Sequence, residues 1–357
     1  MTASAIDFAE MRLRELMRVM LRARASDLHL APELPPMARV DGRIAALAAP
    51  PLSTEDVEGV SEALARRRGP HAERGRERDD FAIEDAEFGT VRVHLYRAGG
   101  PRIALRALGG AIPAPAEIGV PRRVLEFAQL HGGLVVVAGA TGSGKTTTAA
   151  ALIDAINAEQ PRHIVSIEEP IEFRHRSRSA LVTQREIGVD VGDAAEGIRA
   201  ALREDPDVIF LGELRDGAAV ETALTAAETG HLVLTTLHAR GADAAAERIV
   251  DLAPAERRDH VRRQLAHVLA GVVYQRLVAR AEGTGRVAAF EILVATAAVR
   301  SLLREGKTHQ LRNAMATGRA AGMQTLAAHL EELLLRGAVD DATVRAVLRD
   351  AGYAQDG

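Results

Sequence analysis

The sequence contains no cysteine and no tryptophan, and aromatic residues make up only 3% of its 357 residues. The lack of cysteine excludes disulfide bonds, thiolate zinc sites and cysteine nucleophiles. With so few aromatic residues, the core has to be built from Ala, Leu, Val and Ile. No apolar run approaches the roughly 20 residues of a membrane-spanning helix, and the N-terminus lacks the pattern of a secretion signal. These absences favour a cytoplasmic protein.

Positive and negative charges nearly balance, with 45 Lys and Arg against 49 Asp and Glu and a net charge of −4. That balance disfavours a dedicated nucleic-acid binder, which usually has a strongly basic domain. Only Lys145 and Lys307 are lysines, so nearly every basic residue is arginine. Hydrophobic residues make up 47% and charged residues 26%, as in ordinary globular proteins. The length predicts two or three domains.

The first part of the chain carries the patterns of a small α+β domain. Apolar residues at helical spacing predict a helix over residues 8–24, and Ser53 with acidic residues behind it predicts the start of a second helix. Alternating patterns predict short strands over residues 26–30, 37–47, 81–83 and 91–95. We expect an N-terminal α+β domain over residues 1–108 and, from the glycines and prolines that follow, a linker over residues 109–119.

From about residue 120 strands and helices alternate, an order typical of a parallel α/β sheet. The predicted strands cover residues 133–138, 163–167, 207–211 and 231–236. The first is an unbroken apolar run, as expected for a strand buried on both faces. After about residue 255 the pattern is mostly helical, apart from a strand-like segment at 286–293. The expected division is an α/β core over residues 120–290 and a helical region over residues 291–357.

A glycine-rich segment, Gly-Ala-Thr-Gly-Ser-Gly-Lys-Thr at 139–146, matches the phosphate-loop pattern G-x-x-x-x-G-K-[ST] at every position. Its glycines allow backbone N–H groups to face phosphates, and the predicted helix that follows adds partial positive charge. We expect Lys145 to reach the β- and γ-phosphates and the Thr146 hydroxyl to coordinate Mg²⁺. The predicted nucleoside triphosphate site consists of Gly139, Ala140, Thr141, Gly142, Ser143, Gly144, Lys145, Thr146 and Thr147.

Hydrolysis also requires carboxylates that place Mg²⁺ and orient the attacking water. Candidates stand at the ends of predicted strands, where open α/β sheets bind their ligands. Gly212 occupies a position in which many P-loop proteins carry an aspartate. The candidate side chains are Glu168, Glu169, Glu172, Glu213, His231 and His238.

Together these motifs resemble the secretion-ATPase superfamily and, within it, the PilT-like twitching-motility ATPases that power type IV pilus retraction. The resemblance covers about residues 10–335. The absence of cysteine favours the retraction type, because assembly and type II secretion ATPases usually carry a four-cysteine zinc motif. The short region before the phosphate loop favours it too. The similar segments are residues 25–30, 34–42, 139–148, 167–173, 201–207, 212–216, 225–233, 298–307 and 322–326.

The resemblance implies a RecA-like P-loop NTPase core, a small N-terminal α+β (PAS-like) domain and a C-terminal helical region, with ATP and Mg²⁺ as ligands. It implies that Glu168 polarises the attacking water and that Glu213 is the Walker B glutamate, which holds Mg²⁺ through water. It implies that His231 and His238 sense the γ-phosphate and relay its loss. Arg92 and Arg106 resemble arginines that reach a nucleotide across an interface, and the spacing leaves open whether Arg97 or Arg102 joins them.

The expected protein is a homohexameric motor driving type IV pilus retraction. By resemblance it acts on an inner-membrane pilus platform protein, is held at the cytoplasmic face of that membrane through protein partners, and has paralogous pilus ATPases as further candidate partners. No nucleic acid is expected. One alternative is an accessory subunit that binds nucleotide, docks on a paralogous ring and hydrolyses little. Others are an assembly or secretion traffic ATPase and, more weakly, a nucleic-acid translocase.

Overall fold

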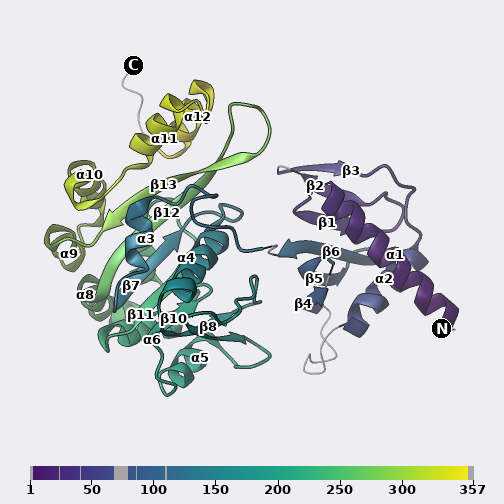
Figure 1. The fold of residues 1–357 in the computed structure, drawn as a ribbon, viewed down its shortest axis with the longest axis horizontal. Helices are drawn as coiled ribbons and strands as arrows, with labels where there is room; N and C mark the ends of the chain where they lie inside the picture. Colours follow the sequence, from purple (N-terminus) through teal and green to yellow (C-terminus); the bar gives the residue numbers. More distant parts are fainter. Residues whose placement is uncertain are drawn as a thin grey trace. The chain divides into compact units, whose positions relative to one another are not determined.

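The computed structural model describes residues 3–23, 25–40, 42–67, 79–85, 87–108 and 111–352 (Figure 1). Two compact units are present, Met1–Ala111 with Pro170–Phe173, and Ile112–Glu169 with Arg174–Gly357. The first two residues of the expected linker, 109 and 110, lie outside the described residues. Each unit is described by itself.

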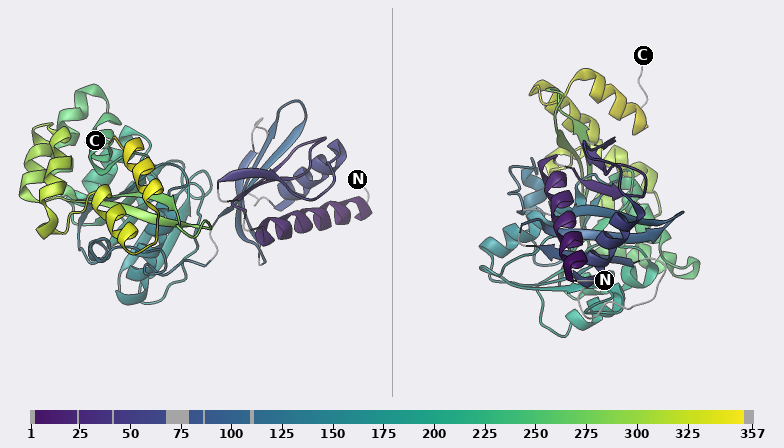
Figure 2. Two further views of the ribbon diagram at one scale, coloured as in Figure 1. Left: turned by 90° about the horizontal axis from the view of Figure 1, so that it is seen from above. Right: turned by 90° about the vertical axis from the view of Figure 1, so that its right-hand side faces the viewer.

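The first unit contains an antiparallel sheet with the strand order β3-β2-β1-β6-β5-β4. Its helices are α1 (Ala3–Arg22), visible along its full length in Figure 2, and α2 (Thr54–Arg67). The expected capping box starts α2, since the backbone N–H of Asp56 donates to Ser53 Oγ at 3.0 Å and that of Ser53 donates to the Asp56 carboxylate at 2.8 Å. The strands are β1 (Asp27–Leu30), β2 (Met37–Val40), β3 (Arg43–Ala46), β4 (Asp79–Asp85), β5 (Gly89–Arg97) and β6 (Pro101–Leu108).

The second unit is built on a sheet with the strand order β13-β12-β7-β11-β10-β8-β9. Only the edge pair β12 and β13 is antiparallel, and the other neighbours are parallel. The strands are β7 (Gly133–Ala138), β8 (His163–Glu168), β9 (Leu181–Glu186), β10 (Val208–Leu211), β11 (Leu232–Leu237), β12 (Leu269–Ala279) and β13 (Arg286–Val294). The helices are α3 (Arg122–Phe127), α4 (Lys145–Glu159), α5 (Ala194–Ala201), α6 (Gly217–Glu228), α7 (Ala242–Asp251), α8 (Arg258–Val268), α9 (Ala297–Arg304), α10 (Leu311–Thr317), α11 (Leu326–Leu335) and α12 (Asp341–Asp350), with short 3₁₀ turns at Ala255–Arg257, Thr308–Gln310 and Arg319–Ala321.

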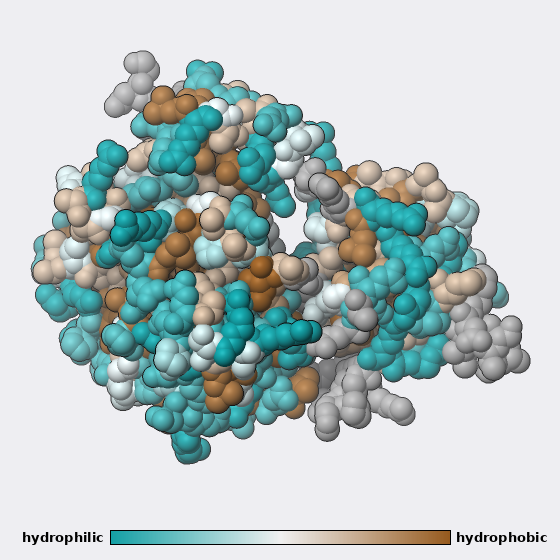
Figure 3. Space-filling view, viewed as in Figure 1, coloured by the Kyte–Doolittle hydropathy of each residue, from teal (hydrophilic) through white to brown (hydrophobic). Residues whose placement is uncertain are grey.

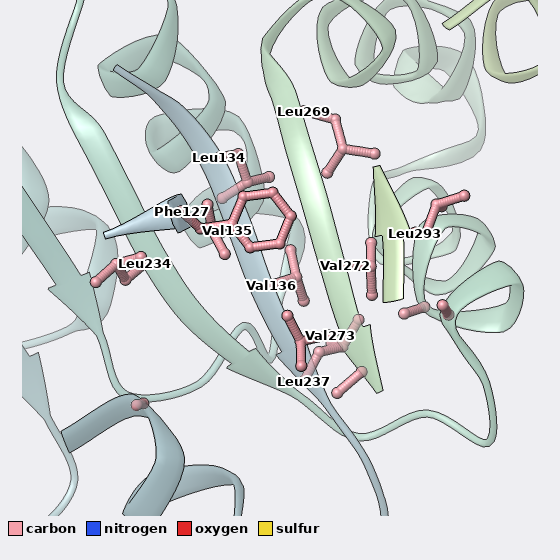
Figure 4. Packing of buried hydrophobic residues seen from close by; sticks show 14 of the residues in the cluster. Phe127, Leu134, Val135, Val136, Leu234, Leu237, Leu269, Val272, Val273 and Leu293 are labelled. Atoms are coloured by element: carbon pink, nitrogen blue, oxygen red, sulfur yellow. The ribbon is translucent and has the colours of Figure 1, made fainter. Parts of the chain in front are cut away.

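The direction of the crossovers sets which face of this sheet each helix covers. The chain passes from β7 through α4 to β8, and then returns in the opposite direction through α5 to β10 and through α6 to β11. Because such crossovers are right-handed, α4 covers one face and α5 and α6 cover the other. The strand β7 is therefore buried on both sides, and Figure 4 shows Leu134 and Val136 of β7 between Leu234 of β11 and Val272 of β12.

Several predicted strands are confirmed, and β7 has the bounds that the sequence predicts. The expectation of a mostly helical chain after residue 255 is wrong for Leu269–Ala279, which forms β12 beside β7. Its apolar run lacks the alternation of a half-buried strand, and such a run does not distinguish a buried strand from a buried helix. The predicted boundary at residue 290 falls inside β13, which pairs with β12 along its whole length.

The surface shown in Figure 3 is mostly hydrophilic, with single apolar residues scattered over it. Single exposed apolar side chains of this kind are normal in folded proteins. Among the helices of the described ranges, none combines the length and the apolar character needed to cross a membrane.

A buried histidine makes the stability of the second unit depend on pH. The Nδ1 atom of His329 on α11 accepts a hydrogen bond from the backbone N–H of Phe290 at 2.8 Å, so the ring is neutral with its proton on Nε2. Burial lowers the pKa of His329, and burial also lowers the pKa of His175. The unfolded chain therefore binds protons at these residues at a higher pH than the folded chain does.

We expect the free energy of unfolding to be highest above the ordinary histidine pKa of about 6.5. It should fall as the pH drops from there through the lower pKa values of the folded state. Urea unfolding at pH 7.5, 6.5 and 5.5 measures this. In His329→Asn, the amide oxygen can accept the same hydrogen bond without titrating, so the loss on acidification should be smaller. Equal losses in the variant and the parent would contradict this role of His329.

Candidate nucleotide site

The predicted phosphate loop connects the carboxyl end of β7 to the first residue of α4. Its three glycines have positive φ angles of 158° at Gly139, 74° at Gly142 and 87° at Gly144. A Cβ atom at Gly139 would lie 2.4 Å from Ser143 Oγ, so a side chain there would break the turn. The loop is thus wound tightly around the start of α4, where backbone N–H groups have no helical acceptor and can bind an anion.

Two buried polar groups show that the loop suits a phosphate group. Lys145 is only 8% exposed, and its Nζ atom donates to the carbonyl of Ala140 at 2.9 Å, across the loop. The Ser143 hydroxyl oxygen is buried and has no hydrogen-bond partner among the described residues. Buried polar atoms normally have partners, and a phosphate oxygen bound in the loop is a suitable one. Thr146 and Thr147 follow in the first turn of α4 and are partly exposed.

Glu168 is the last residue of β8 and is only 5% exposed. The Ser166 hydroxyl donates to its Oε1 atom at 2.7 Å and the Gln184 amide donates to the same atom at 3.1 Å. The other end of the Gln184 amide accepts from the backbone N–H of His175 at 2.8 Å, so Gln184 is itself fixed. The carboxylate of Glu168 is therefore held in one orientation. The role of Gln184 is not visible in the sequence because it depends on the pairing of β8 with β9, whereas Ser166 lies on β8 itself, two residues before Glu168.

Glu213 follows the carboxyl end of β10 and lies within a cluster of charges. Its Oε1 atom is 3.0 Å from His238 Nε2, and its Oε2 atom accepts from Arg215 Nε at 2.8 Å. Arg215 also contacts Glu169, so it links the candidate carboxylates after β8 and β10. Since β7, β11, β10 and β8 are consecutive and parallel, Glu168, Glu213, His238 and the phosphate loop follow the same edge of the sheet.

The presence of a glycine at position 212 has a steric explanation. A Cβ atom at Gly212 would lie 3.3 Å from the Cα and 3.6 Å from the Cγ of Glu168. An aspartate in that position, as in many P-loop proteins, would crowd Glu168 and bring a second negative charge beside it. The glycine leaves the space to Glu168.

The structure does not bring His231 and His238 together. They stand at opposite ends of β11, and the backbone N–H of Gly133, at the start of β7, bonds to the carbonyl of His231. The six residues of β11 span roughly 20 Å at about 3.3 Å per residue. His231 is therefore remote from the phosphate loop of its own chain. Its Nδ1 atom lies 2.9 Å from the carbonyl of Ala226 at the end of α6.

The predicted arginines lie in the first unit, where Arg92 and Arg106 are opposite each other on β5 and β6. Arg106 Nε donates to Asp27 Oδ1 at 2.7 Å, and Arg39 Nε lies 3.7 Å from Asp27 Oδ2. Asp27 is 7% exposed and also accepts from the Ser26 hydroxyl. It thus anchors Arg106 from the neighbouring strand. Asp27 lies in one of the family-like segments, residues 25–30, but no pattern in the sequence indicates this role.

A cavity of about 400 Å³ lies elsewhere in the second unit, at the start of β7 rather than at its carboxyl end. Each of its charged lining residues makes at least one hydrogen bond within the chain, and the buried Nε atom of Arg123 has no partner among the described residues. Arg123 bonds to Glu126 at 2.7 Å, Glu228 accepts from Gln264 at 2.8 Å, and Arg300 donates to the carbonyls of Ala295 and Ala266. Because the cavity lies at the start of β7 and the phosphate loop follows the end of that strand, the two are separate.

The loop, its buried lysine and the carboxylates along one sheet edge define a P-loop nucleotide hydrolase. Residues 116–351 match the family described as type II/IV secretion system protein, and the chain belongs to this family. This confirms the secretion-ATPase resemblance, and with it the predicted class of ATP hydrolase.

The relatives also include retraction ATPases. The type IV pilus retraction ATPase PilT of Pseudomonas aeruginosa is 40% identical over 337 residues, which cover 94% of this chain and 97% of PilT. Escherichia coli YggR, named an uncharacterized protein, is 44% identical over 318 residues, covering 88% of this chain and 96% of YggR. A crystal structure of the pilus retraction motor PilT with bound ADP superposes with a TM-score of 0.80 at 37% identity, covering 93% of this chain and 96% of that one. The predicted α/β fold with a RecA-like core is confirmed by this match.

Proposed function

We propose that this chain is an ATP-hydrolysing motor that drives type IV pilus retraction and works as a homohexamer. The observation that carries the proposal is the buried, doubly hydrogen-bonded Glu168 on the same sheet edge as the Lys145 loop. A subunit that only bound nucleotide would need the loop but not an oriented carboxylate beside it. The similarity to the retraction ATPase PilT over 94% of the chain supports pilus retraction as the process that the motor drives.

In this proposal the loop N–H groups and Lys145 bind the phosphates of ATP. The Thr146 hydroxyl would hold Mg²⁺, and Glu213 would hold it through water. When bound, the ion neutralises charge on the β- and γ-phosphates. Glu168 orients the attacking water and accepts its proton, and the hydrogen bonds from Ser166 and Gln184 keep its carboxylate in position.

We assign different work to the two histidines. His238 bonds to Glu213 and is proposed to respond to the loss of the γ-phosphate. His231 is proposed to fix the start of β11 to the end of α6 through its ring nitrogen. Arg92 and Arg106 are proposed to act on the nucleotide in the assembled ring, with Asp27 setting the direction of Arg106.

The proposed partners are further copies of this chain, a pilus platform protein of the inner membrane and paralogous pilus ATPases. Attachment to the cytoplasmic face of that membrane is proposed to run through the platform protein. The division into an N-terminal domain, a linker, an ATPase core and a C-terminal helical region belongs to the same proposal.

The test is ATP turnover as a function of protein concentration, with the mass of the particle determined on the same samples. We expect activity to rise as the chain assembles into a six-membered ring. If the ring binds ATP but hydrolyses it no faster than the Glu168→Gln variant does, the motor proposal is wrong and an accessory subunit is favoured. Stimulation of turnover by DNA would favour a translocase.

A further inference from the structure

A glutamine on β12 makes contact with the phosphate loop from the side. Gln275 is 3% exposed, and β12 pairs in parallel with β7, the strand that leads into the loop. Its amide Nε2 atom donates to the carbonyl of Ser143 at 2.8 Å. Its Oε1 atom accepts from the Thr148 hydroxyl at 2.6 Å. The two contacts fall on either side of Lys145, one in the loop and one in the first turn of α4.

The side-chain amide suits this position because it donates and accepts at the same time. An ionised glutamate would accept from Thr148 but repel the Ser143 carbonyl. Methionine, which has a similar length, would neither donate to Ser143 nor accept from Thr148. The backbone is close as well, since a Cβ atom at Gly139 would lie 2.5 Å from the carbonyl oxygen of Gln275. A Cβ atom at Gly144 would lie 2.7 Å from its Nε2 atom. Two of the loop glycines thus make room for Gln275.

We propose that Gln275 is a positioning residue of the nucleotide site, which fixes the loop on both sides of Lys145 so that the lysine and the N–H groups of α4 are arranged for phosphate before it binds. Preformed donors bind an anion without the cost of ordering the loop at that moment. The hydrolysis part of this inference rests on the proposed function, whereas the binding part does not.

The same contacts could serve stability alone, and the fold separates the two roles. The strand β12 is held by backbone pairing to β7 and, over Gly271–Ala279, to β13, and neither ladder involves the side-chain amide of Gln275. A variant without the amide keeps these ladders. A purely structural role would therefore lower the unfolding temperature without changing the affinity of the folded protein for nucleotide.

The experiment uses the full chain and measures the Kd of fluorescent ADP, kcat and KM for ATP, and the unfolding temperature. The variants are Gln275→Met, Thr148→Val and the double variant, with Gln264→Met at a partly exposed position of α8 as the matched control. We expect Gln275→Met to raise the Kd and lower kcat, each by about 10-fold or more, since small misplacements of binding groups have large effects. Thr148→Val should also raise the Kd and lower kcat, but by a smaller factor. The Kd and kcat of the double variant should be no worse than those of Gln275→Met alone.

Unchanged Kd and kcat in folded Gln275→Met would overturn the inference, as would effects of the two substitutions that simply add, because residues acting through one contact are coupled. A lower unfolding temperature with an unchanged Kd would also overturn it. If the parent protein binds ADP but hydrolyses no ATP, the motor proposal fails, and the Kd measurements still decide the role of Gln275. If Gln275→Met does not fold, the Kd of Thr148→Val decides it.

Discussion

Glu168→Gln is expected to lower kcat for ATP hydrolysis by about 10²- to 10⁴-fold, the usual contribution of a general base. The neutral amide has nearly the shape of the carboxylate and keeps an oxygen that accepts from Ser166 and Gln184. It lacks the charge and the basicity that polarise water. Nucleotide binding should remain, because the phosphates are bound by the loop and Lys145. Single-turnover ATP hydrolysis and ADP affinity, measured on the same preparation, test both statements.

The matched control is Glu221→Gln on α6, which removes a carboxylate from a surface ion pair with Arg257. Such exposed pairs contribute about 0–1 kcal/mol to stability, and Glu221 is not part of the sheet edge that carries the loop. Its turnover should equal that of the parent. If Glu168→Gln retained more than a tenth of the parental kcat, the base would have to be another carboxylate of this edge. Glu169, which contacts Arg215, would then be tested first.

The parts of the site that the sequence predicted are those formed by residues that follow one another in the chain. The loop at 139–146 needs its glycines, its lysine and its threonine in one turn, and the apolar run before it fixes β7. Glu168 and Glu213 could be chosen as candidates because carboxylates at the ends of buried parallel strands gather at one edge.

The parts that were missed depend on which strands become neighbours. Gln275 contacts the loop only because β12 pairs with β7, and an apolar run that fits strand and helix alike hid that pairing. Asp27 anchors Arg106 across 79 residues of sequence, which no local pattern reveals. His231 and His238, by contrast, flank a strand that the sequence predicts, and β11 separates them as that prediction implies. Spacing along the chain predicts proximity in a loop or helix and distance in a strand.

Lys145→Arg is expected to weaken ATP and ADP binding by about 10- to 100-fold, although it keeps the charge. Hydrogen bonds to charged groups contribute about 1.5–3 kcal/mol, and each 1.4 kcal/mol is about tenfold in Kd. Lys145 is only 8% exposed, and its ammonium lies 2.9 Å from the Ala140 carbonyl, inside a tightly wound loop. A planar guanidinium is wider and directs its donors differently. We therefore expect it either to displace the loop or to point out of the loop.

Lys307→Arg is the internal control, since Lys145 and Lys307 are the two lysines of a chain that otherwise uses arginine. The Lys307 side chain is 49% exposed and pairs with Glu305 at 2.7 Å on the surface. Arginine can make that pair equally well, so nucleotide affinity should not change and the free energy of unfolding should shift by less than about 0.5 kcal/mol. Titration of both variants with fluorescent ADP measures the contrast. Equal affinities in Lys145→Arg and Lys307→Arg would mean that the loop needs a positive charge but not the compact ammonium that the sequence retains there.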